Sequence, residues 1–171
     1  MISLKGKTAI VTGASRGIGA ATVRKLSDLG ANVFFTYKSS PDNAAALSNE
    51  TGATPILCDQ SDGVKIEKTV DEIFAQTGSI DILVNNAGIT KDGFFMIMPC
   101  DDWNCVLETN LNGAFRWTKC VARKMYAQRR GAIIFVSSVS GLVGVAGQTN
   151  YAASKGALCA FSRAAAAELG A

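Results

Sequence analysis

The stretch Thr12-Gly13-Ala14-Ser15-Arg16-Gly17-Ile18-Gly19 directly follows a short apolar segment, Thr8-Ala9-Ile10-Val11, near the start of the chain. Gly13 permits a tight turn, Gly17 lets the backbone approach a phosphate, and Gly19 lets a helix pack closely against the preceding strand. The free N–H groups at the start of such a helix attract anions. A buried strand, a glycine turn and a helix in this order predict a fold that binds a dinucleotide.

Short apolar segments alternate with stretches of helical length along the rest of the sequence. Most of the apolar segments are rich in β-branched residues, which is typical of strands buried on both faces. We expect strands at 8–11, 32–36, 54–57, 81–84 and 132–136, and helices at 17–29, 42–51, 62–77, 102–128 and 150–169. This alternation predicts an α/β fold with a doubly wound, Rossmann-like parallel sheet. Residues 1–171 have the length of a single NAD(P)-binding domain.

The bulk composition indicates a folded protein and excludes several function classes. The chain has 171 residues, 48% of them hydrophobic and 18% charged, so disorder is not expected. The net charge is +3 and the basic residues are scattered, which argues against a nucleic-acid partner. None of the five cysteines forms a C-x-x-C motif, which argues against a zinc site and a disulfide framework. We expect the cysteines to be buried as small hydrophobic side chains.

The sequence predicts neither a signal peptide nor a membrane-spanning segment. The first residues lack the apolar core of a signal peptide. The uncharged stretch 131–154 is long enough to span a bilayer, but it is rich in Ser, Gly, Thr, Asn and Gln. A buried strand and an apolar loop explain it better. Together with the cysteine pattern, this predicts a cytoplasmic protein.

The end of the second expected strand indicates which dinucleotide binds. The segment Thr36-Tyr37-Lys38-Ser39-Ser40 lacks the Asp or Glu that usually holds the ribose hydroxyls of NAD. Lys38, Ser39 and Arg16 can instead form charge-assisted hydrogen bonds to a 2′-phosphate. We therefore favour NADPH/NADP+ over NAD. The alternative is that Lys38 is an ordinary solvated lysine in a turn.

Tyr151, Lys155 and Ser138 form a group that can deliver a proton. Tyr151 and Lys155 are four residues apart at the start of the last expected helix, so they share a face. The lysine ammonium favours the phenolate form of its neighbour, which lets Tyr151 act as general acid toward a ketone oxygen. Ser138, just after the fifth strand, can donate a hydrogen bond to the same oxygen. The three residues together predict reduction of a ketone by hydride transfer.

Two further asparagine positions suggest contacts near this group. Asn85-Asn86-Ala87-Gly88 follows the fourth strand, where its small residues and amides suit a wall against the cofactor; an ordinary Asx turn is the alternative. Asn110 lies inside the long expected helix, although Asn is a poor helix former. We expect a local kink that frees a carbonyl for a water leading to Lys155. The alternative is a solvated polar residue.

These motifs, in this order, resemble those of the classical short-chain dehydrogenase/reductases. The resemblance implies that Asn110, Ser138, Tyr151 and Lys155 form a catalytic tetrad, and that Ser138, Gln148 and Tyr151 contact the substrate. It also implies that Asp59 contacts adenine and that Arg16 marks members that use NADPH. The implied contacts to the cofactor come from Gly13, Ser15, Arg16, Gly17, Ile18, Gly19, Lys38, Ser39, Asp59, Asn86, Ala87, Gly88, Tyr151 and Lys155. No metal ligands are implied.

Within this family, residues 86–92, 137–141 and 147–156 are most similar to 3-oxoacyl-acyl-carrier-protein reductases. The implied function is NADPH-dependent reduction of a 3-oxoacyl thioester in fatty acid biosynthesis. The substrate would be linked to acyl carrier protein or CoA, with Arg129 at the docking patch and a homo-oligomer, tetramer or dimer, as the assembly. The alternatives are an acetoacetyl-CoA, polyketide, sugar or steroid ketone as the substrate, or a non-catalytic nucleotide-binding fragment. Family members run on for about a further third of their own length, so we expect their C-terminal strands and substrate lid to be absent here.

Overall fold

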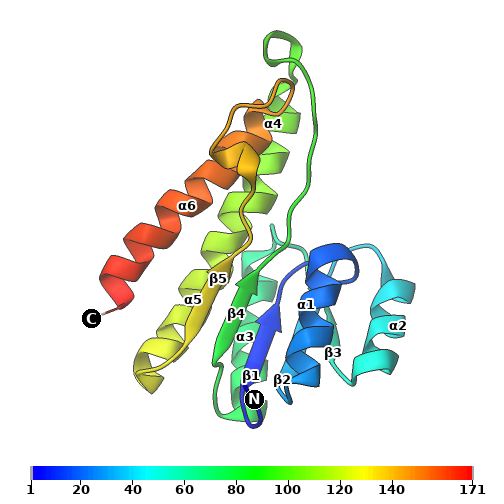
Figure 1. Ribbon diagram of the computed structural model, residues 1–171, viewed down its shortest axis with the longest axis vertical. Helices are drawn as coiled ribbons and strands as arrows, with labels where there is room; N and C mark the ends of the chain where they lie inside the picture. Colours follow the sequence, from blue (N-terminus) through cyan, green and yellow to red (C-terminus); the bar gives the residue numbers. More distant parts are fainter. Residues whose placement is uncertain (1, 171) are drawn as a thin grey trace.

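The computed structural model describes residues 2–170 and contains one parallel five-stranded sheet. The spatial order is β3-β2-β1-β4-β5, so the direction of strand addition reverses beside β1. The carboxyl ends of all strands meet at one edge, drawn at the top of the sheet in Figure 1. The prediction of a doubly wound parallel sheet is confirmed. The strands are β1 (Thr8–Val11), β2 (Asn32–Tyr37), β3 (Thr54–Leu57), β4 (Ile82–Asn85) and β5 (Ala132–Phe135).

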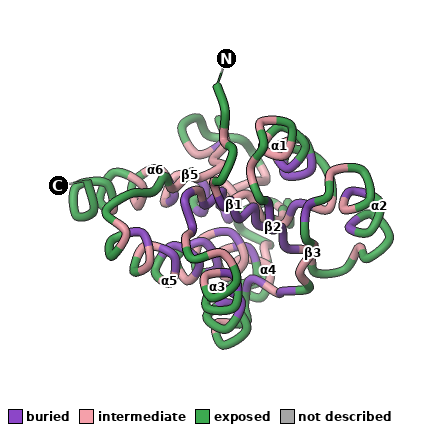
Figure 2. The backbone as a smooth tube through the Cα atoms, turned by 90° about the horizontal axis from the view of Figure 1, so that it is seen from below, coloured by how far each residue is buried: buried purple, intermediate pink, exposed green. Residues whose placement is uncertain are grey.

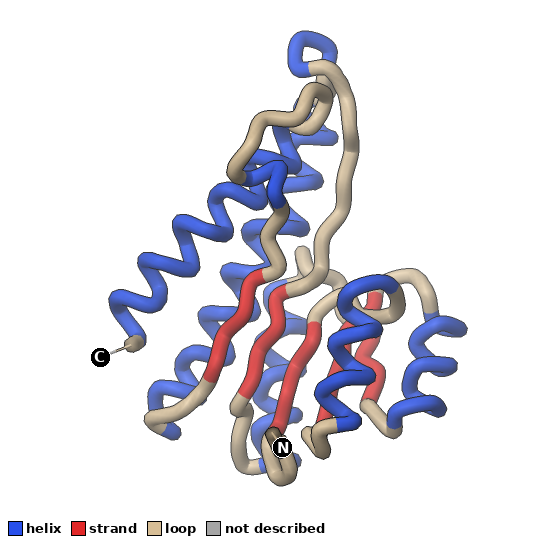
Figure 3. The backbone as a smooth tube through the Cα atoms, viewed as in Figure 1, coloured by secondary structure: helices blue, strands red, loops and turns tan. Residues whose placement is uncertain are grey.

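Helices cover both faces of this sheet, with α1 and α2 on one side and α3 and α5 on the other (Figure 3). Residues with special backbone roles set several helix ends. Asp62 caps α3 by accepting a hydrogen bond from Lys65 N at 2.9 Å, and Gly52 ends α2 in the left-handed conformation. The helices are α1 (Gly17–Asp28), α2 (Pro41–Thr51), α3 (Gly63–Thr77), α4 (Cys100–Leu107), α5 (Gly113–Gln128) and α6 (Thr149–Leu169). Three shorter turns are η1 (Phe95–Ile97), η2 (Glu108–Asn112) and η3 (Val139–Gly141).

The apolar core forms two layers, one on each face of the sheet. Because successive strand residues point to opposite faces, Ala9 and Val11 of β1 pack with α1 and α2, whereas Ile10 packs with α3 and α5. Trp117 of α5 is fully buried in the second layer. Figure 2 shows this buried material concentrated around β1 and its neighbours.

The strands at the two edges of the sheet are less buried than the sequence predicted. All four residues of β1 are buried, but β3 and β5 contain no buried residue, and Ile134 of β5 is 50% exposed. The prediction of burial on both faces was therefore wrong for β3 and β5. The physical reason is position in the sheet, because an edge strand lacks one neighbour and less of it is covered.

The prediction of a single long helix at residues 102–128 was also wrong. The structure divides it into α4 and α5, with the π-helical turn η2 between them. Asn110 lies in this turn with its side chain directed inward, where Oδ1 accepts a hydrogen bond from Ile89 N at 2.8 Å and Nδ2 donates to Ile89 O at 3.0 Å. An extra residue in a helical turn rotates a side chain relative to its neighbours, and such turns recur at functional sites. The helix is thus irregular at Asn110, as expected, but the freed carbonyl stays a prediction.

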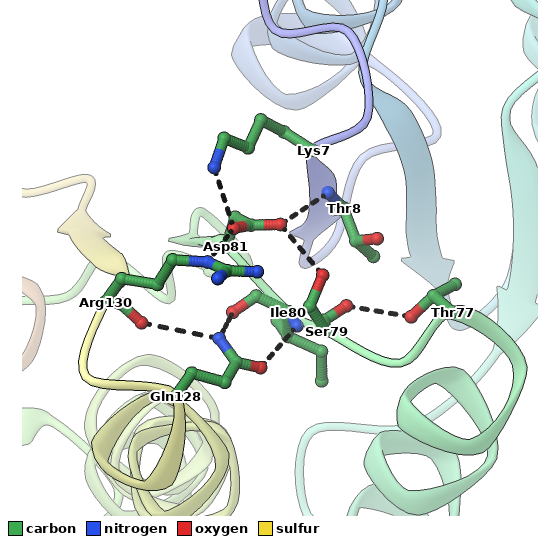
Figure 4. Close-up of polar contacts among 8 residues, drawn as sticks. All are labelled: Lys7, Thr8, Thr77, Ser79, Ile80, Asp81, Gln128 and Arg130. Atoms are coloured by element: carbon green, nitrogen blue, oxygen red, sulfur yellow. Dashed lines mark hydrogen bonds and ion pairs between the residues drawn. The ribbon is translucent and has the colours of Figure 1, made fainter.

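The amino ends of three strands are joined by a polar cluster at the edge of the sheet opposite the glycine turn (Figure 4). Asp81 is 6% exposed and lies between Lys7 and Arg130, at 3.2 and 3.0 Å from their nitrogens. It also accepts hydrogen bonds from Thr8 N and Ser79 Oγ. This cluster fixes the relative positions of β1, β4 and β5 where the strands begin.

The five cysteines form no disulfide, and the prediction that they are buried was wrong for Cys100 and Cys105. Cys58 is buried, Cys120 and Cys159 are half-buried, and Cys100 and Cys105 of α4 are exposed. Cys100 and Cys105 lie on the solvent side of a helix whose only buried residue is Val106. Among residues 2–170, no helix is both long and apolar enough to cross a membrane.

Candidate active site

The glycine turn lies at the carboxyl end of β1 and opens α1. Gly13 and Gly17 adopt the left-handed conformation, with φ of 61° and 59°. A Cβ on Gly13 would lie 2.6 Å from Ala87 Cα, and one on Gly19 would lie 2.5 Å from Asn86 Nδ2. A Cβ on Gly17 would meet no atom within 4 Å. The turn therefore packs tightly against the segment after β4, while its backbone at Gly17 stays open to a phosphate group.

Thr12 and Asn86 hold this turn in place. The Thr12 hydroxyl accepts hydrogen bonds from the backbone N–H groups of Asn86 and Ala87, both at 3.1 Å. Asn86 Nδ2 donates to Thr12 O at 2.9 Å and to Gly13 O at 3.0 Å. The amide of Asn86 is thus directed at the glycine turn rather than at open space. The sequence pattern did not predict this role of Thr12, although a buried hydroxyl at the end of a strand needs hydrogen-bond partners.

The residues expected at the 2′-phosphate and at adenine follow β1, β2 and β3 at the same edge. Arg16, Lys38 and Ser39 are exposed, and Ser15 is half-buried. Gly13 N donates to Thr36 Oγ1 at 3.0 Å, which joins the glycine turn to the end of β2. Lys38 Nζ lies 2.7 Å from Asp59 Oδ2. The side chain of Lys38 is 70% exposed, so the alternative of a solvated lysine in a turn still stands, but this lysine also pairs with Asp59.

Lys155 is a buried lysine beside the ring of Tyr151. It is 3% exposed, and its Nζ donates a hydrogen bond to Val136 O at 2.7 Å. The same nitrogen lies 5.6 Å from the centre of the Tyr151 ring. Burial lowers the pKa of Lys155 below its ordinary value. The buried ammonium therefore faces the aromatic ring of the residue expected to donate the proton.

The segment with Ser138 is fixed against α6, which carries Tyr151 and Lys155. Ser137 Oγ donates to Lys155 O at 2.8 Å, and Ser138 Oγ accepts from Ser140 N at 3.2 Å at the start of η3. A Cβ on Gly141 would lie 2.6 Å from the backbone nitrogen of Gly156. Only a glycine at position 141 lets η3 and α6 approach this closely.

Asn110 reaches the same place from η2. It is fully buried, so the interpretation of a solvated residue is wrong. Asn110 Nδ2 donates to Ser154 Oγ at 3.0 Å, and Ser154 Oγ donates to Tyr151 O at 2.7 Å. A Cβ on Gly88 would lie 3.3 Å from Asn110 Oδ1 and 3.5 Å from Lys155 Nζ. The structure therefore brings Asn110, Lys155 and Tyr151 together beside the segment after β4.

The bridging role of Ser154 had a faint signal in the sequence, because Tyr151 and Ser154 are three residues apart on one helix. The water expected between Asn110 and Lys155 stays a prediction.

Gln148, expected at the substrate, precedes α6 and joins two loops. Its Oε1 accepts from Ser140 Oγ at 3.0 Å, and its Nε2 donates to Asp92 Oδ2 at 3.1 Å. Backbone contact between Gly93 N and Gly147 O at 2.8 Å strengthens the same junction. Both loops carry exposed apolar side chains, namely Phe94, Phe95, Met96, Ile97, Leu142, Val143 and Val145. The contact of Gln148 with a substrate stays a prediction.

The parallel sheet with a glycine turn after β1 and a Tyr-Lys pair on α6 matches one family model. The model of the short chain dehydrogenases covers residues 7–171. The chain belongs to the short chain dehydrogenase family. This is a family of oxidoreductases, and the resemblance inferred from the motifs is confirmed.

Individual relatives carry more specific names. The chain is 44% identical over 170 residues to the 3-oxoacyl-(acyl-carrier-protein) reductase FabG of Escherichia coli, covering 98% of this chain and 69% of that protein. It is 41% identical over 168 residues to the protein of the same name from Staphylococcus epidermidis, covering 95% of this chain and 69% of the relative. A crystal structure of NAD+-bound xylitol dehydrogenase superposes with a TM-score of 0.91 at 32% identity, covering 98% of this chain and 66% of the other. The chain thus spans about two thirds of the length of these proteins.

Proposed function

We propose that this protein catalyses the NADPH-dependent reduction of a 3-oxoacyl thioester, linked to acyl carrier protein, to the 3-hydroxyacyl thioester. The convergence of Tyr151, Lys155 and Asn110 beside an open glycine turn is the observation that carries the proposal. The subfamily assignment rests on the FabG relatives at 41–45% identity.

The residues of the site have distinct roles in the proposed reaction. When bound, the nicotinamide ring supplies a hydride to the ketone carbon. Tyr151 donates its proton to the ketone oxygen, and Ser138 holds that oxygen by a hydrogen bond. Lys155 stabilises the resulting phenolate, since its ammonium lies in a dry site 5.6 Å from the ring centre. The carbonyl of Val136 fixes the ammonium in that position.

The glycine turn is the proposed binding site for the pyrophosphate. The open backbone at Gly17 fits a phosphate group, and the start of α1 directs its free N–H groups toward it. Ile18, Ala87 and Gly88 line the nicotinamide and ribose side in this proposal. Arg16, Lys38 and Ser39 favour NADPH over NADH because they offer two cations and a hydroxyl to a 2′-phosphate.

Replacement of one hydroxyl tests the proton donor. With acetoacetyl thioester as the substrate, we expect NADPH oxidation by the unsubstituted protein and a loss of about 10²- to 10⁴-fold in kcat for Tyr151→Phe. The dissociation constant for NADPH should stay nearly the same. Tyr126→Phe, at an exposed tyrosine of α5, is the matched control and should be fully active. Normal turnover by Tyr151→Phe would refute the assignment of the donor.

A second candidate is a reductase of a polyol-derived or sugar ketone, which the likeness to xylitol dehydrogenase favours. Under that proposal a ketose, and not an acetoacetyl thioester, would be reduced with the same dependence on Tyr151. The exposed apolar side chains of the two loops joined by Gln148 favour the acyl substrate, because a sugar would gain little from them. NADPH binding without turnover of either ketone would instead support the non-catalytic interpretation.

We also propose a homo-oligomer in the cytoplasm, with an acidic carrier protein docking near Arg129. Phe115 and Tyr126 of α5 are large and exposed, which favours association of this helix with another copy. Two neighbouring cations are already paired, Lys124 with Asp71 and Arg130 with Asp81, which leaves the exposed Arg123 and Arg129 for the proposed docking. Light scattering would give the mass of the assembly, and Arg129→Ala should raise KM for the carrier-linked substrate only.

A further inference from the structure

Lys38 and Asp59 form an ion pair at the edge of the sheet that we assign to the adenosine half of the dinucleotide. Lys38 follows β2 and Asp59 follows β3, and these strands pair with Tyr37 opposite Leu57. Lys38 Nζ lies 2.7 Å from Asp59 Oδ2. From the sequence, Lys38 was expected at the 2′-phosphate and Asp59 at adenine. The structure shows that the two side chains contact each other.

The carboxylate of Asp59 is the fixed member of this pair. Its Oδ1 accepts a hydrogen bond from Ser61 N at 3.0 Å, so the turn after β3 sets the direction of the group. Burial by itself raises the pKa of Asp59, but hydrogen bonds from Lys38 and Ser61 outweigh burial and leave that pKa below the ordinary value. The side chain of Lys38 is 70% exposed against 33% for Asp59. The lysine is therefore the partner that can move.

Arg16 differs from Lys38 in this respect. It is exposed at the start of α1 and forms no ion pair with any residue of the described range 2–170. Hydrogen bonds from Gly13 N and Ala14 N to Thr36 hold the glycine turn against the end of β2, so both cations lie at one edge. A 2′-phosphate entering here meets one free cation and one that a carboxylate already neutralises.

We propose that Asp59 competes with the 2′-phosphate of NADPH for Lys38 and thereby sets how strongly the site prefers NADPH to NADH. This proposal rests on the proposed function. NADH carries a hydroxyl at that position and can bind with the Lys38–Asp59 pair intact. NADPH requires the lysine to leave or share its carboxylate, and it brings a like charge toward Asp59. The carboxylate thus weakens binding of the phosphorylated dinucleotide alone.

Dissociation constants for NADPH and NADH, measured by calorimetry on the full chain, test this. We expect Asp59→Asn to lower the dissociation constant for NADPH, relative to that for NADH, about three- to fivefold, the order expected for one exposed ion pair. A lost adenine contact would change both constants equally and cancel from this ratio. Lys38→Met should weaken NADPH alone. In the double variant, Asp59→Asn should no longer lower the dissociation constant for NADPH below that of Lys38→Met, because its effect acts through Lys38.

Glu50→Gln is the matched control. It removes the same charge and breaks an exposed ion pair with Arg24, but it does so at the far end of α2. It should change neither dissociation constant.

The outcomes separate this inference from the proposed function. An unchanged NADPH-to-NADH ratio in Asp59→Asn, in a protein that binds and oxidises NADPH, overturns the inference alone. Equal weakening of both nucleotides also overturns it, because Asp59 would then be only an adenine contact. If Asp59→Asn improved NADPH binding equally in the Lys38→Met background, Asp59 would not act through Lys38 and the inference would be overturned. Binding of neither nucleotide by the unsubstituted protein overturns the inference and the proposed function together.

Discussion

Substitution of Asp81 tests what holds β1, β4 and β5 together at their amino ends. Its Oδ1 faces Lys7 and Arg130, and its Oδ2 faces Thr8 N and Ser79 Oγ (Figure 4). Two variants separate charge from hydrogen bonding. Asp81→Asn keeps one oxygen but places an amino group toward one set of donors. Asp81→Ala removes every acceptor.

The expected losses follow from burial. In Asp81→Asn the remaining oxygen can serve Thr8 and Ser79, while the cations of Lys7 and Arg130 turn to water, because they are 44% and 57% exposed. We expect a loss of about 1–3 kcal/mol in the free energy of unfolding. Asp81→Ala also leaves the buried N–H of Thr8 without an acceptor, and we expect about 3–5 kcal/mol. For a chain of this size, each kcal/mol lowers Tm by about 2–4 °C.

Urea unfolding followed by tryptophan fluorescence measures these free energies. Repeating the measurement across pH shows how much of each loss depends on the charge of Asp81. Burial by itself raises the pKa of Asp81, but hydrogen bonds from Thr8, Arg130, Lys7 and Ser79 outweigh it and leave that pKa below the ordinary value. A carboxylate with a lowered folded-state pKa stabilises the protein above its unfolded pKa of about 3.9, and this stabilisation is lost as pH falls through the folded pKa. The gap between wild type and Asp81→Asn should therefore be full at neutral pH and close in acid.

Glu50→Gln, which breaks an exposed pair with Arg24, is the control for loss of a carboxylate. If neither Asp81 variant lost more stability than this control, the cluster would not contribute to folding and the reasoning would be refuted. A gap that did not close in acid would refute the role of the charge.

Three other substitutions test the site. Thr12→Val should lose about 1–3 kcal/mol of stability in urea unfolding, because two half-buried backbone donors lose their acceptor, whereas Thr12→Ser should lose less. Lys155→Met should abolish turnover yet raise Tm at neutral pH, because it removes a buried ammonium; since burial lowers the pKa of Lys155, that gain should shrink as pH rises toward 10.5. Gly141→Ala should lower kcat about tenfold or more without changing the NADPH dissociation constant, because its Cβ would push η3 and Ser138 away from α6. A fully active Gly141→Ala would contradict the last of these.

The sequence by itself determined the fold class and the edge of the sheet that carries the site. Alternating apolar and helical periods specify β-α units, and right-handed crossovers leave no other place for residues that follow a strand. The glycine turn, Asn86 and Ser138 could therefore be assigned to one edge without coordinates. Tyr151 and Lys155 share a face because of their spacing alone.

Only the tertiary structure decided which groups are partners. The π-helical turn at Asn110 arises because its amide binds the backbone of Ile89, 21 residues away, and no local pattern encodes a bond of that range. The same holds for Lys38 with Asp59, which meet only because β2 and β3 are neighbours. Burial at the sheet edges likewise depends on strand order, which period-2 patterns do not contain. Local propensity depends on consecutive residues, so the sequence reveals it directly. Contacts between distant side chains form only when the chain has packed.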